Sequence, residues 1–297
     1  MKRRSLLRAT LAATVGTIVV SGGTSFYAHT IEPAWIEINT LPVHLPRLDP
    51  AFHGYRIVHI TDIHIDDAWM TAKRLEEIVQ LVNGQKADLV VITGDFVTDE
   101  YNISARTLAP LRYLQARDGV LAVLGNHDIW SGPELIRSIL EDNDVRVLAD
   151  TTHSIQRHDA ALHIIGMDDL WPSSDVVEPV WTHKDRFQRL TDALPDTGAA
   201  ILLVHEPDFA DIAAANGRCA LQLSGHSHGG QIRVPFLGAI QVPPLASRYR
   251  DGLYRVGQML HYTNRGLGMV EPRVRLNCLP EIATFVCLAD GYAKTPW

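Results

Sequence analysis

Side chains that can bind metal ions follow successive apolar runs along the chain. Each lies just beyond the end of a run or in the loop after it: Asp62, His64, Asp95, Asn126, His127, His205, His226 and His228. Carboxylate, imidazole and amide oxygen are donors suited to divalent cations, and no thiolate is among them. Such ions commonly activate water and polarise a substrate. The pattern therefore indicates a metal centre for hydrolysis.

Each pattern taken alone also has an ordinary explanation. An Asp-x-His triplet occurs often by chance, His205 can be a core histidine, and Gly94-Asp95 is typical of a turn. Residues 126–128 can cap the helix that is expected to begin at Pro133. The two histidines within the Gly-rich stretch 224–230 have less structural use. Suitable residues at five successive strand ends, in order, are improbable by chance. The whole set therefore favours a metal site.

The apolar runs are expected to be strands separated by helices. A helix is predicted around residues 75–82, where apolar residues recur at helical spacing, and another through residues 108–114. This alternation predicts a largely parallel sheet, and ligands collect beyond the carboxyl ends of such strands. The expected strands cover residues 56–60, 88–93, 119–124, 162–165, 199–204 and 220–223. The C-terminal third is expected to form antiparallel strands, with residues 282–287 as the last.

The chain divides into three segments. Residues 1–30 are basic and then apolar, and Arg3-Arg4-Ser-Leu-Leu resembles a twin-arginine export signal. A retained membrane anchor is the alternative, although the apolar stretch is short for a bilayer. Both alternatives predict a protein that is exported to the cell envelope or tethered to the cytoplasmic membrane. Residues 31–54 are an extended lead-in, and residues 55–290 form one catalytic domain.

Charge and cysteine content exclude several classes of protein. The net charge is −7, and the basic residues of the N-terminal segment make the remainder more acidic still. Such a body is a poor binder of nucleic acid, which requires clustered Lys and Arg. The three cysteines form no C-x-x-C pair, which excludes zinc-finger and thioredoxin-like sites. Buried free thiols are expected, with a Cys278–Cys287 disulfide as the alternative.

The ordered motifs together resemble those of the calcineurin-like metallophosphoesterase superfamily. They are Asp62-Ile-His64, Gly94-Asp95, Gly125-Asn126-His127-Asp128, His205 and Gly225-His226-Ser-His228. The resemblance implies a metal-dependent phosphoric ester hydrolase with an α/β fold, a four-layer αββα sandwich of two mixed sheets flanked by helices. The motifs at residues 229–231 and 264–268 are similar to a bacterial exported or membrane-associated phosphodiesterase branch. That branch includes relatives that cleave UDP-2,3-diacylglucosamine.

The resemblance also implies a ligand set for two divalent metal ions. Asp62, His64 and His228 would bind the first ion. Asn126, His205 and His226 would bind the second. Asp95 would bridge the two. Mn is the metal that the resemblance favours, with Fe, Zn or Co as alternatives that the mixed N/O ligands equally allow.

The resemblance further implies a mechanism. A water shared by two metals would have its pKa lowered toward about 7, and the resulting bridging hydroxide would attack phosphorus. His127 would face the leaving group as hydrogen-bond donor or general acid, and Asp128 would orient His127. A helix N-cap near Pro133 is the alternative for Asp128. Arg265 would contact a phosphate oxygen or, alternatively, form a surface salt bridge.

The predicted function is a phosphodiesterase or pyrophosphohydrolase acting on an envelope or lipid-linked phosphate substrate. A non-catalytic metal-binding scaffold is the alternative, and the choice among monoester, diester and pyrophosphate stays open. Trp69, Tyr101 and Trp171 line a substrate groove or simply cover the core.

Overall fold

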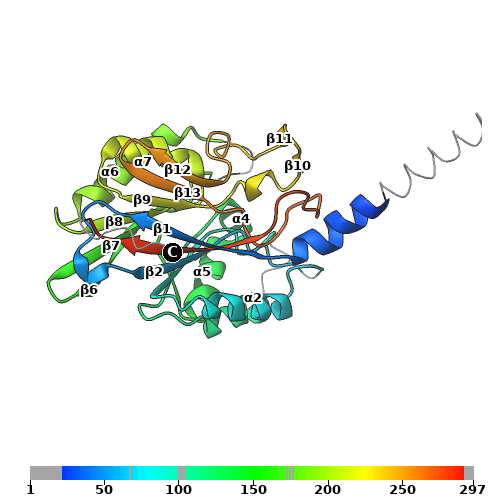
Figure 1. Cartoon of the computed structure of the whole chain (residues 1–297), viewed down its shortest axis with the longest axis horizontal. Coiled ribbons are helices and arrows are strands. Elements are labelled where there is room, and N and C mark those ends of the chain that lie inside the picture. Colours follow the sequence, from blue (N-terminus) through cyan, green and yellow to red (C-terminus); the bar gives the residue numbers. More distant parts are fainter. Residues whose placement is uncertain are drawn as a thin grey trace, which may run out of the picture.

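Two six-stranded mixed sheets face each other, and helices cover both outer faces (Figure 1). The computed structural model describes residues 22–66, 68–99, 105–171, 173, 175 and 177–290. The four layers are the αββα sandwich that the sequence predicts. The twin-arginine motif, the apolar run at residues 11–20 and Tyr101 lie outside the described residues.

The first sheet contains the strands that end at the first three polar clusters. Its order is β1 (Glu37–His44), β14 (Glu281–Leu288), β2 (Tyr55–Ile60), β3 (Leu89–Thr93), β4 (Val120–Val123) and β5 (Val145–Val147). All neighbours are parallel except β14 and β2. The expected last strand is therefore present as β14. Strand β1, within the segment expected to be an extended lead-in, pairs with β14 along its whole length.

The second sheet supplies the other two polar clusters. Its order is β12 (Gly252–Val256), β13 (Met259–Thr263), β9 (Leu221–Ser224), β8 (Ala199–Leu203), β7 (Ala160–Gly166) and β6 (Thr151–Arg157). The C-terminal third is not wholly antiparallel, because β13 runs parallel to β9 and β14 runs parallel to β1. Within this sheet the short β6–β7 and β12–β13 connections form antiparallel hairpins, since two-residue loops reverse the chain whereas longer crossovers allow parallel pairing.

Three apolar clusters hold the layers together. The central cluster joins the inner faces of the two sheets, with Val91 and Leu121 on one side and Ile201 and Leu223 on the other. A second cluster lies between the first sheet and helices α2 (Ala72–Gly84) and α5 (Pro133–Glu141). A third lies beneath α6 (Lys184–Asp192) and α7 (Ala210–Asn216). All residues of β3 and β8 are buried, as expected for parallel strands covered on both faces.

The predicted helices are only partly confirmed. Helix α2 buries Leu75, Ile78, Val79 and Val82, the apolar residues that predicted it, and the Thr71 hydroxyl accepts from Arg74 N at its start. The stretch through residues 108–114 is instead a short helix α3 (Ala105–Leu108) followed by a 3-10 helix (Ala109–Tyr113). Pro110 has no backbone N–H, so a continuous α-helix is disfavoured there.

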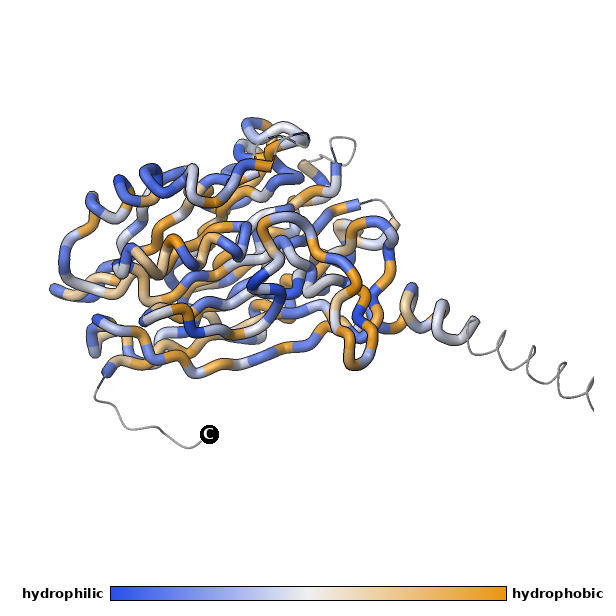
Figure 2. The backbone as a smooth tube through the Cα atoms, turned by 90° about the horizontal axis from the view of Figure 1, so that it is seen from above, coloured by the Kyte–Doolittle hydropathy of each residue, from blue (hydrophilic) through white to orange (hydrophobic). Residues whose placement is uncertain are grey.

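The N-terminal part of the described chain leaves the body as a helix, whose last turn is the π-helical segment η1 (Tyr27–Ile31) (Figure 2). Among the described residues no helix is both long enough and apolar enough to span a bilayer. Cys219, Cys278 and Cys287 are buried free thiols, as expected.

Candidate metal centre

The loops after β2, β3, β8 and β9 bring metal-competent side chains to one edge of the sandwich. Two groups form there, and the ligand atoms within each lie within 4.8 Å of one another. The first group is Asp62, His64, Asp95 and His228, and the second is Asp95, His205 and His226. Asp95 belongs to both groups. The arrangement is therefore two adjacent cation sites that share one carboxylate.

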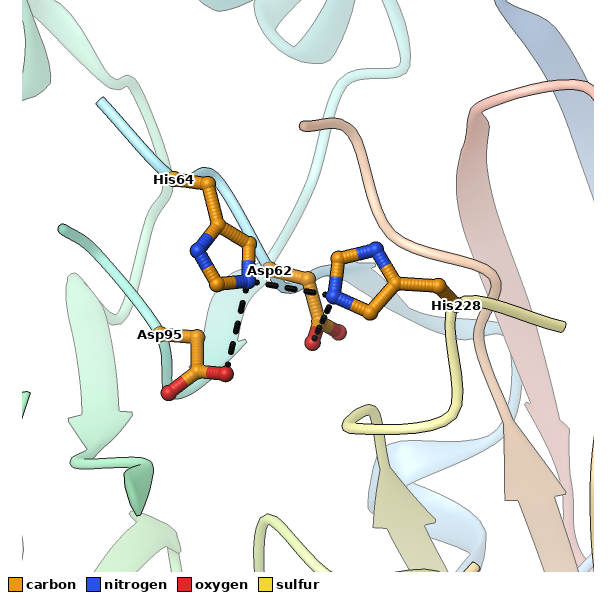
Figure 3. A group of neighbouring side chains, drawn as sticks. All are labelled: Asp62, His64, Asp95 and His228. Atoms are coloured by element: carbon orange, nitrogen blue, oxygen red, sulfur yellow. Dashed lines mark hydrogen bonds and ion pairs between the residues drawn. The ribbon is translucent and has the colours of Figure 1, made fainter. Parts of the chain in front are cut away.

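The first group points toward a common centre (Figure 3). His64 Nε2 lies 3.1 Å from His228 Nε2 and 3.4 Å from Asp95 Oδ2. His228 Nε2 lies 3.3 Å from Asp62 Oδ1. Two imidazole nitrogens and two carboxylates converging in this way can surround a cation.

The backbone of these loops is held in an uncommon conformation. Left-handed φ angles occur at Asp62 (49°), His64 (48°), Asp95 (56°), His226 (67°) and His228 (49°). Non-glycine residues rarely adopt such angles, and they cluster at functional sites where the surrounding structure enforces them. These loops are thus shaped to aim side chains inward.

Neighbouring glycines make room for the carboxylates. A Cβ atom on Gly125 would lie 2.4 Å from Asp95 Oδ1. One on Gly225 would lie 2.3 Å from Asp62 Oδ2. Larger residues at either position would displace a metal-competent side chain.

Hydrogen bonds to backbone carbonyls set which nitrogen of His205 and of His226 faces the cluster. His205 Nδ1 donates to Thr93 O over 2.6 Å, which leaves Nε2 for the site. His226 Nε2 donates to Pro244 O over 2.8 Å, which leaves Nδ1. Such partners are the usual means of orienting a ligating histidine.

A divalent cation fits the ligand atoms that the site presents. Asn126 is buried, and its Oδ1 has no hydrogen-bond partner among the described residues. A buried acceptor without a donor is costly unless a cation meets it. Asn126 lines the same pocket as Asp95, His226 and His228. Its amide oxygen can therefore act as a further metal ligand beside the second group.

The ionisation states of the metal-competent residues also favour binding of a cation. Burial and His205 lower the pKa of His226 to about 4, and burial and His64 hold the pKa of His228 well below its usual value, so both stay neutral. Burial raises the pKa of Asp62 to about 7. Burial disfavours a charge on His205, but Asp95 outweighs it and raises the His205 pKa well above its usual value. The proton held between Asp95 and His205 is one that a bound cation would replace.

Metal affinity is therefore expected to fall as the pH falls. Binding must release the His205 proton across the neutral range, which weakens binding about tenfold per pH unit. Because the pKa of Asp62 is raised to about 7, this carboxylate is protonated below that pH, and metal binding must then displace a second proton. The affinity therefore depends more steeply on pH in that range. Calorimetric titration of metal-stripped protein with Mn²⁺ between pH 6 and 8 measures this, with circular dichroism confirming that the fold persists. An affinity that does not change with pH contradicts these ionisation states.

A cavity of about 410 Å³ opens above the cluster. Its lining includes Asp95, His226 and His228 of the cluster, together with Asn126 and His127. Six apolar residues, here called the apolar wall, belong to the same lining: Ile232, Ile240, Val242, Pro243, Val270 and Pro272. The pocket therefore suits a substrate with a charged group next to an apolar one.

Two tryptophans of the pocket lining contact each other. Trp130 Nε1 donates to Trp171 O over 3.0 Å, and the rings meet edge to face. Trp171, for which the sequence allowed a groove or a core position, lines the pocket. Sequence reasoning missed Trp130, although it lies one helical turn after Asn126 in α4 (Asn126–Ser131) and so shares its face.

Asp128 does not have the role expected for it. His127 Nδ1 donates to Thr98 O over 2.7 Å rather than to Asp128. Asp128 Oδ1 accepts from the backbone N–H groups of Phe96 and Val97, and Oδ2 accepts from Gly125 N. Asp128 is buried at the start of α4, which is the helix before the one that begins at Pro133. Its hydrogen bonds connect α4 to the loop that contains Asp95.

Arg265 also differs from its expected position in the substrate site. Its guanidinium is ion-paired with Glu37 and Glu281, the alternative that the sequence left open. It lines a different cavity, together with Tyr27 and Trp35. Arg265 therefore fixes β1 and β14 to the loop after β13 and does not face the cluster.

Arg275 is a supporting residue that sequence reasoning missed. It is fully buried, and its guanidinium donates to the backbone carbonyls of Arg265, Gly266, Gly268 and Cys278. Cβ atoms on Gly266 or Gly268 would collide with Asp62 or with the backbone beside His64, so this loop lies directly behind the first group. No local sequence signal distinguishes Arg275 from a surface arginine.

The fold and the paired cation sites define a metal-dependent hydrolase. The family model for calcineurin-like phosphoesterase matches residues 55–230. The chain is 33% identical over 288 residues to the uncharacterized metallophosphoesterase YkuE of Bacillus subtilis, covering 96% of this chain and 97% of YkuE. It is 29% identical over 286 residues to the phosphodiesterase YaeI of Escherichia coli, covering 92% and 95%. It is 28% identical over 319 aligned residues to the UDP-2,3-diacylglucosamine pyrophosphatase LpxG of Chlamydia muridarum, covering 90% and 94%.

The chain belongs to the calcineurin-like phosphoesterase family. It is a metal-dependent phosphoric ester hydrolase with a dinuclear divalent metal site. The alternative of a non-catalytic scaffold is therefore set aside.

Proposed function

We propose that this enzyme is a phosphodiesterase or pyrophosphohydrolase acting on an envelope or lipid-linked phosphate substrate. The observation that carries the proposal is the pocket, whose lining combines residues of the metal cluster with the apolar wall. The names of two relatives, a phosphodiesterase and a pyrophosphatase of a diacylated sugar nucleotide, agree with this substrate class. The acidic body argues against nucleic acid as the substrate.

The proposed ligands divide between two ions, and Mn is the metal we expect. Asp62, His64 and His228 would hold one ion, Asn126, His205 and His226 the other, and Asp95 both. When bound, the pair supplies Lewis-acid polarisation of the phosphate and activation of water.

The residues around the cluster position the substrate. The His127 ring is fixed by the bond from Nδ1 to Thr98 O, so Nε2 is the nitrogen available to the pocket. Because Nδ1 already donates to Thr98 O, Nε2 carries a proton only in the imidazolium form, and this form can donate to the leaving oxygen as its bond to phosphorus breaks. Trp130 and Trp171 close the space between His127 and His226, which limits water near the reacting group.

His127→Ala is expected to leave metal content unchanged and to slow hydrolysis of an alkyl phosphodiester by about 10²–10⁴-fold. Hydrolysis of bis(p-nitrophenyl) phosphate should fall much less, because its good leaving group needs little protonation. The exposed His44→Ala variant is the control and should match the parent protein. Full activity of His127→Ala on the alkyl diester would refute the assigned role.

The proposed location is the cell envelope, by export or by tethering to the cytoplasmic membrane. Its support is the sequence of residues 1–30, in which Arg3-Arg4 precede a short apolar run. The same segment would place the enzyme next to lipid-linked substrates.

A substrate panel with metal analysis tests the proposed function. Purified full-length protein, loaded in turn with Mn²⁺, Fe²⁺, Co²⁺ and Zn²⁺, is assayed on a phosphomonoester, a phosphodiester and a lipid-linked diphosphate in mixed micelles. We expect two metal equivalents per chain and the highest kcat/KM on the diester or the lipid-linked diphosphate with Mn²⁺. A strong preference for the soluble monoester would overturn the proposal.

A further inference from the structure

The hairpin of β10 (Arg233–Val234) and β11 (Gly238–Ala239) exposes large apolar side chains at its tip. Phe236 and Leu237 retain 107% and 82% of their reference exposure. The turn at residues 234–238 contains no charged residue. Large apolar side chains exposed together commonly mark an interaction site.

The hairpin is continuous with the apolar wall of the catalytic pocket. Ile232 precedes β10, and Ile240 and Val242 follow β11, and all three line the cavity. Ile240 also remains 68% exposed. One apolar surface therefore runs from the metal cluster to the tip of the hairpin.

The same end of the molecule carries the N-terminal helix. Figure 1 shows β10, β11 and this helix at one end of the body. The segment at residues 275–278 connects them. On one side Arg233 N donates to Leu276 O, and on the other Arg275 N donates to Ala28 O. This contact places the hairpin and the helix on either side of one short segment.

The helix region adds further exposed apolar side chains. Phe26, Ile31 and Trp35 are exposed, and the chain that precedes the helix contains the apolar run at residues 11–20. Exposed apolar side chains are thus found twice at this end, on the hairpin and on the region of the described helix.

From this arrangement we infer that the hairpin tip, Phe236 and Leu237, inserts into a lipid bilayer surface. Residues without charge bind by burying apolar area at the interface rather than by attracting anionic headgroups. The one charged side chain of the hairpin strands, Arg233, is paired with Asp251. The pocket then opens at the membrane, and its apolar wall takes up the acyl region of a lipid phosphate. This inference rests on the proposed function and assigns the bilayer as the source of substrate.

A single fluorescent label tests the insertion without any assay of activity. The native cysteines are buried, so Phe236→Cys provides one accessible thiol for an environment-sensitive dye. With phosphatidylcholine vesicles we expect a blue shift of the emission and quenching by nitroxide-labelled lipid, both insensitive to salt. The matched control is Leu253→Cys, an exposed apolar position on β12, which should show neither.

Three results would overturn the inference. They are vesicle binding without a change at position 236, no vesicle binding at all, and a shift that follows protein concentration instead of lipid. The last result would identify a second copy of the chain as the partner of the hairpin.

Kinetics separate this inference from the proposed function. In the double variant Phe236→Ser and Leu237→Ser, hydrolysis of a lipid phosphate in vesicles should fall about tenfold or more, because two large apolar side chains no longer enter the membrane. Hydrolysis of soluble bis(p-nitrophenyl) phosphate should be unchanged. Equal rates of the variant and the parent protein on vesicles refute the hairpin's role, whereas an inactive parent protein on every diester and lipid phosphate refutes the proposed function.

Discussion

Replacement of Asp95 with asparagine is expected to remove both metal ions and to lower kcat by at least about 10³-fold. Asp95 is the one residue shared by the two groups of metal-competent side chains. An amide has no negative charge and only one oxygen, so it cannot bridge two cations. Asp95 Oδ1 also accepts from His127 N over 3.0 Å. The amide oxygen of asparagine can keep this bond only if its NH2 group faces the cluster, where it repels cations.

Metal content and rate must be measured together to interpret this variant. Asn126→Ala should lose one equivalent and keep the other, whereas Asp95→Asn should lose both. Asp211→Asn, an aspartate of α7 paired with Arg248 at the surface, is the control and should behave as the parent protein. Retention of two equivalents in Asp95→Asn would contradict a bridging role.

Replacement of Arg275 with methionine is expected to destabilise the fold by about 4 kcal/mol. Four backbone carbonyls, those of Arg265, Gly266, Gly268 and Cys278, would each lose a buried donor. A change of this size lowers Tm by about 10 °C in a protein of this length. The loop behind Asp62 would loosen at the same time, so metal affinity should also fall.

Thermal unfolding of the metal-free and Mn-loaded forms measures both effects. Arg275→Lys should recover only part of the stability, since an ammonium group cannot reproduce the planar fork of donors. Arg248→Met is the matched control, because Arg248 pairs with Asp211 at the exposed surface and such pairs contribute little. A Tm for Arg275→Met within 2 °C of the parent protein, judged against the shift of about 2–4 °C per kcal/mol, would rule out this role.

The sequence was informative about the positions of the metal-competent residues for a physical reason. Parallel strands covered on both faces must be almost wholly apolar, as β3 and β8 are. A polar residue directly after such a strand, like Asp62 or Asp95, therefore stands out. Because parallel strands end at the same edge, residues far apart in sequence are predicted to meet.

The contacts of residues next to the metal ligands were much less predictable from the sequence. His127 and Asp128 are adjacent in sequence, but the ring bonds to Thr98 O and the carboxylate bonds to Phe96 N and Val97 N. These partners lie about thirty residues away on another loop. Which acceptor a donor meets depends on how two loops pack, and no local pattern encodes that.

By itself the sequence determined the buried strands that precede the polar clusters and the side chains that could hold metal, because burial and strand direction leave periodic and positional marks. The four-layer class and the family were implied by the resemblance of the ordered motifs to a known family. Only the tertiary structure decided that Arg265 joins Glu37 and Glu281 rather than a substrate, and that Arg275 is buried behind the site. It alone also showed that the apolar hairpin continues the wall of the pocket. Whether two charged side chains pair, and whether two apolar surfaces join, depends on distances in space between segments that lie far apart in the sequence.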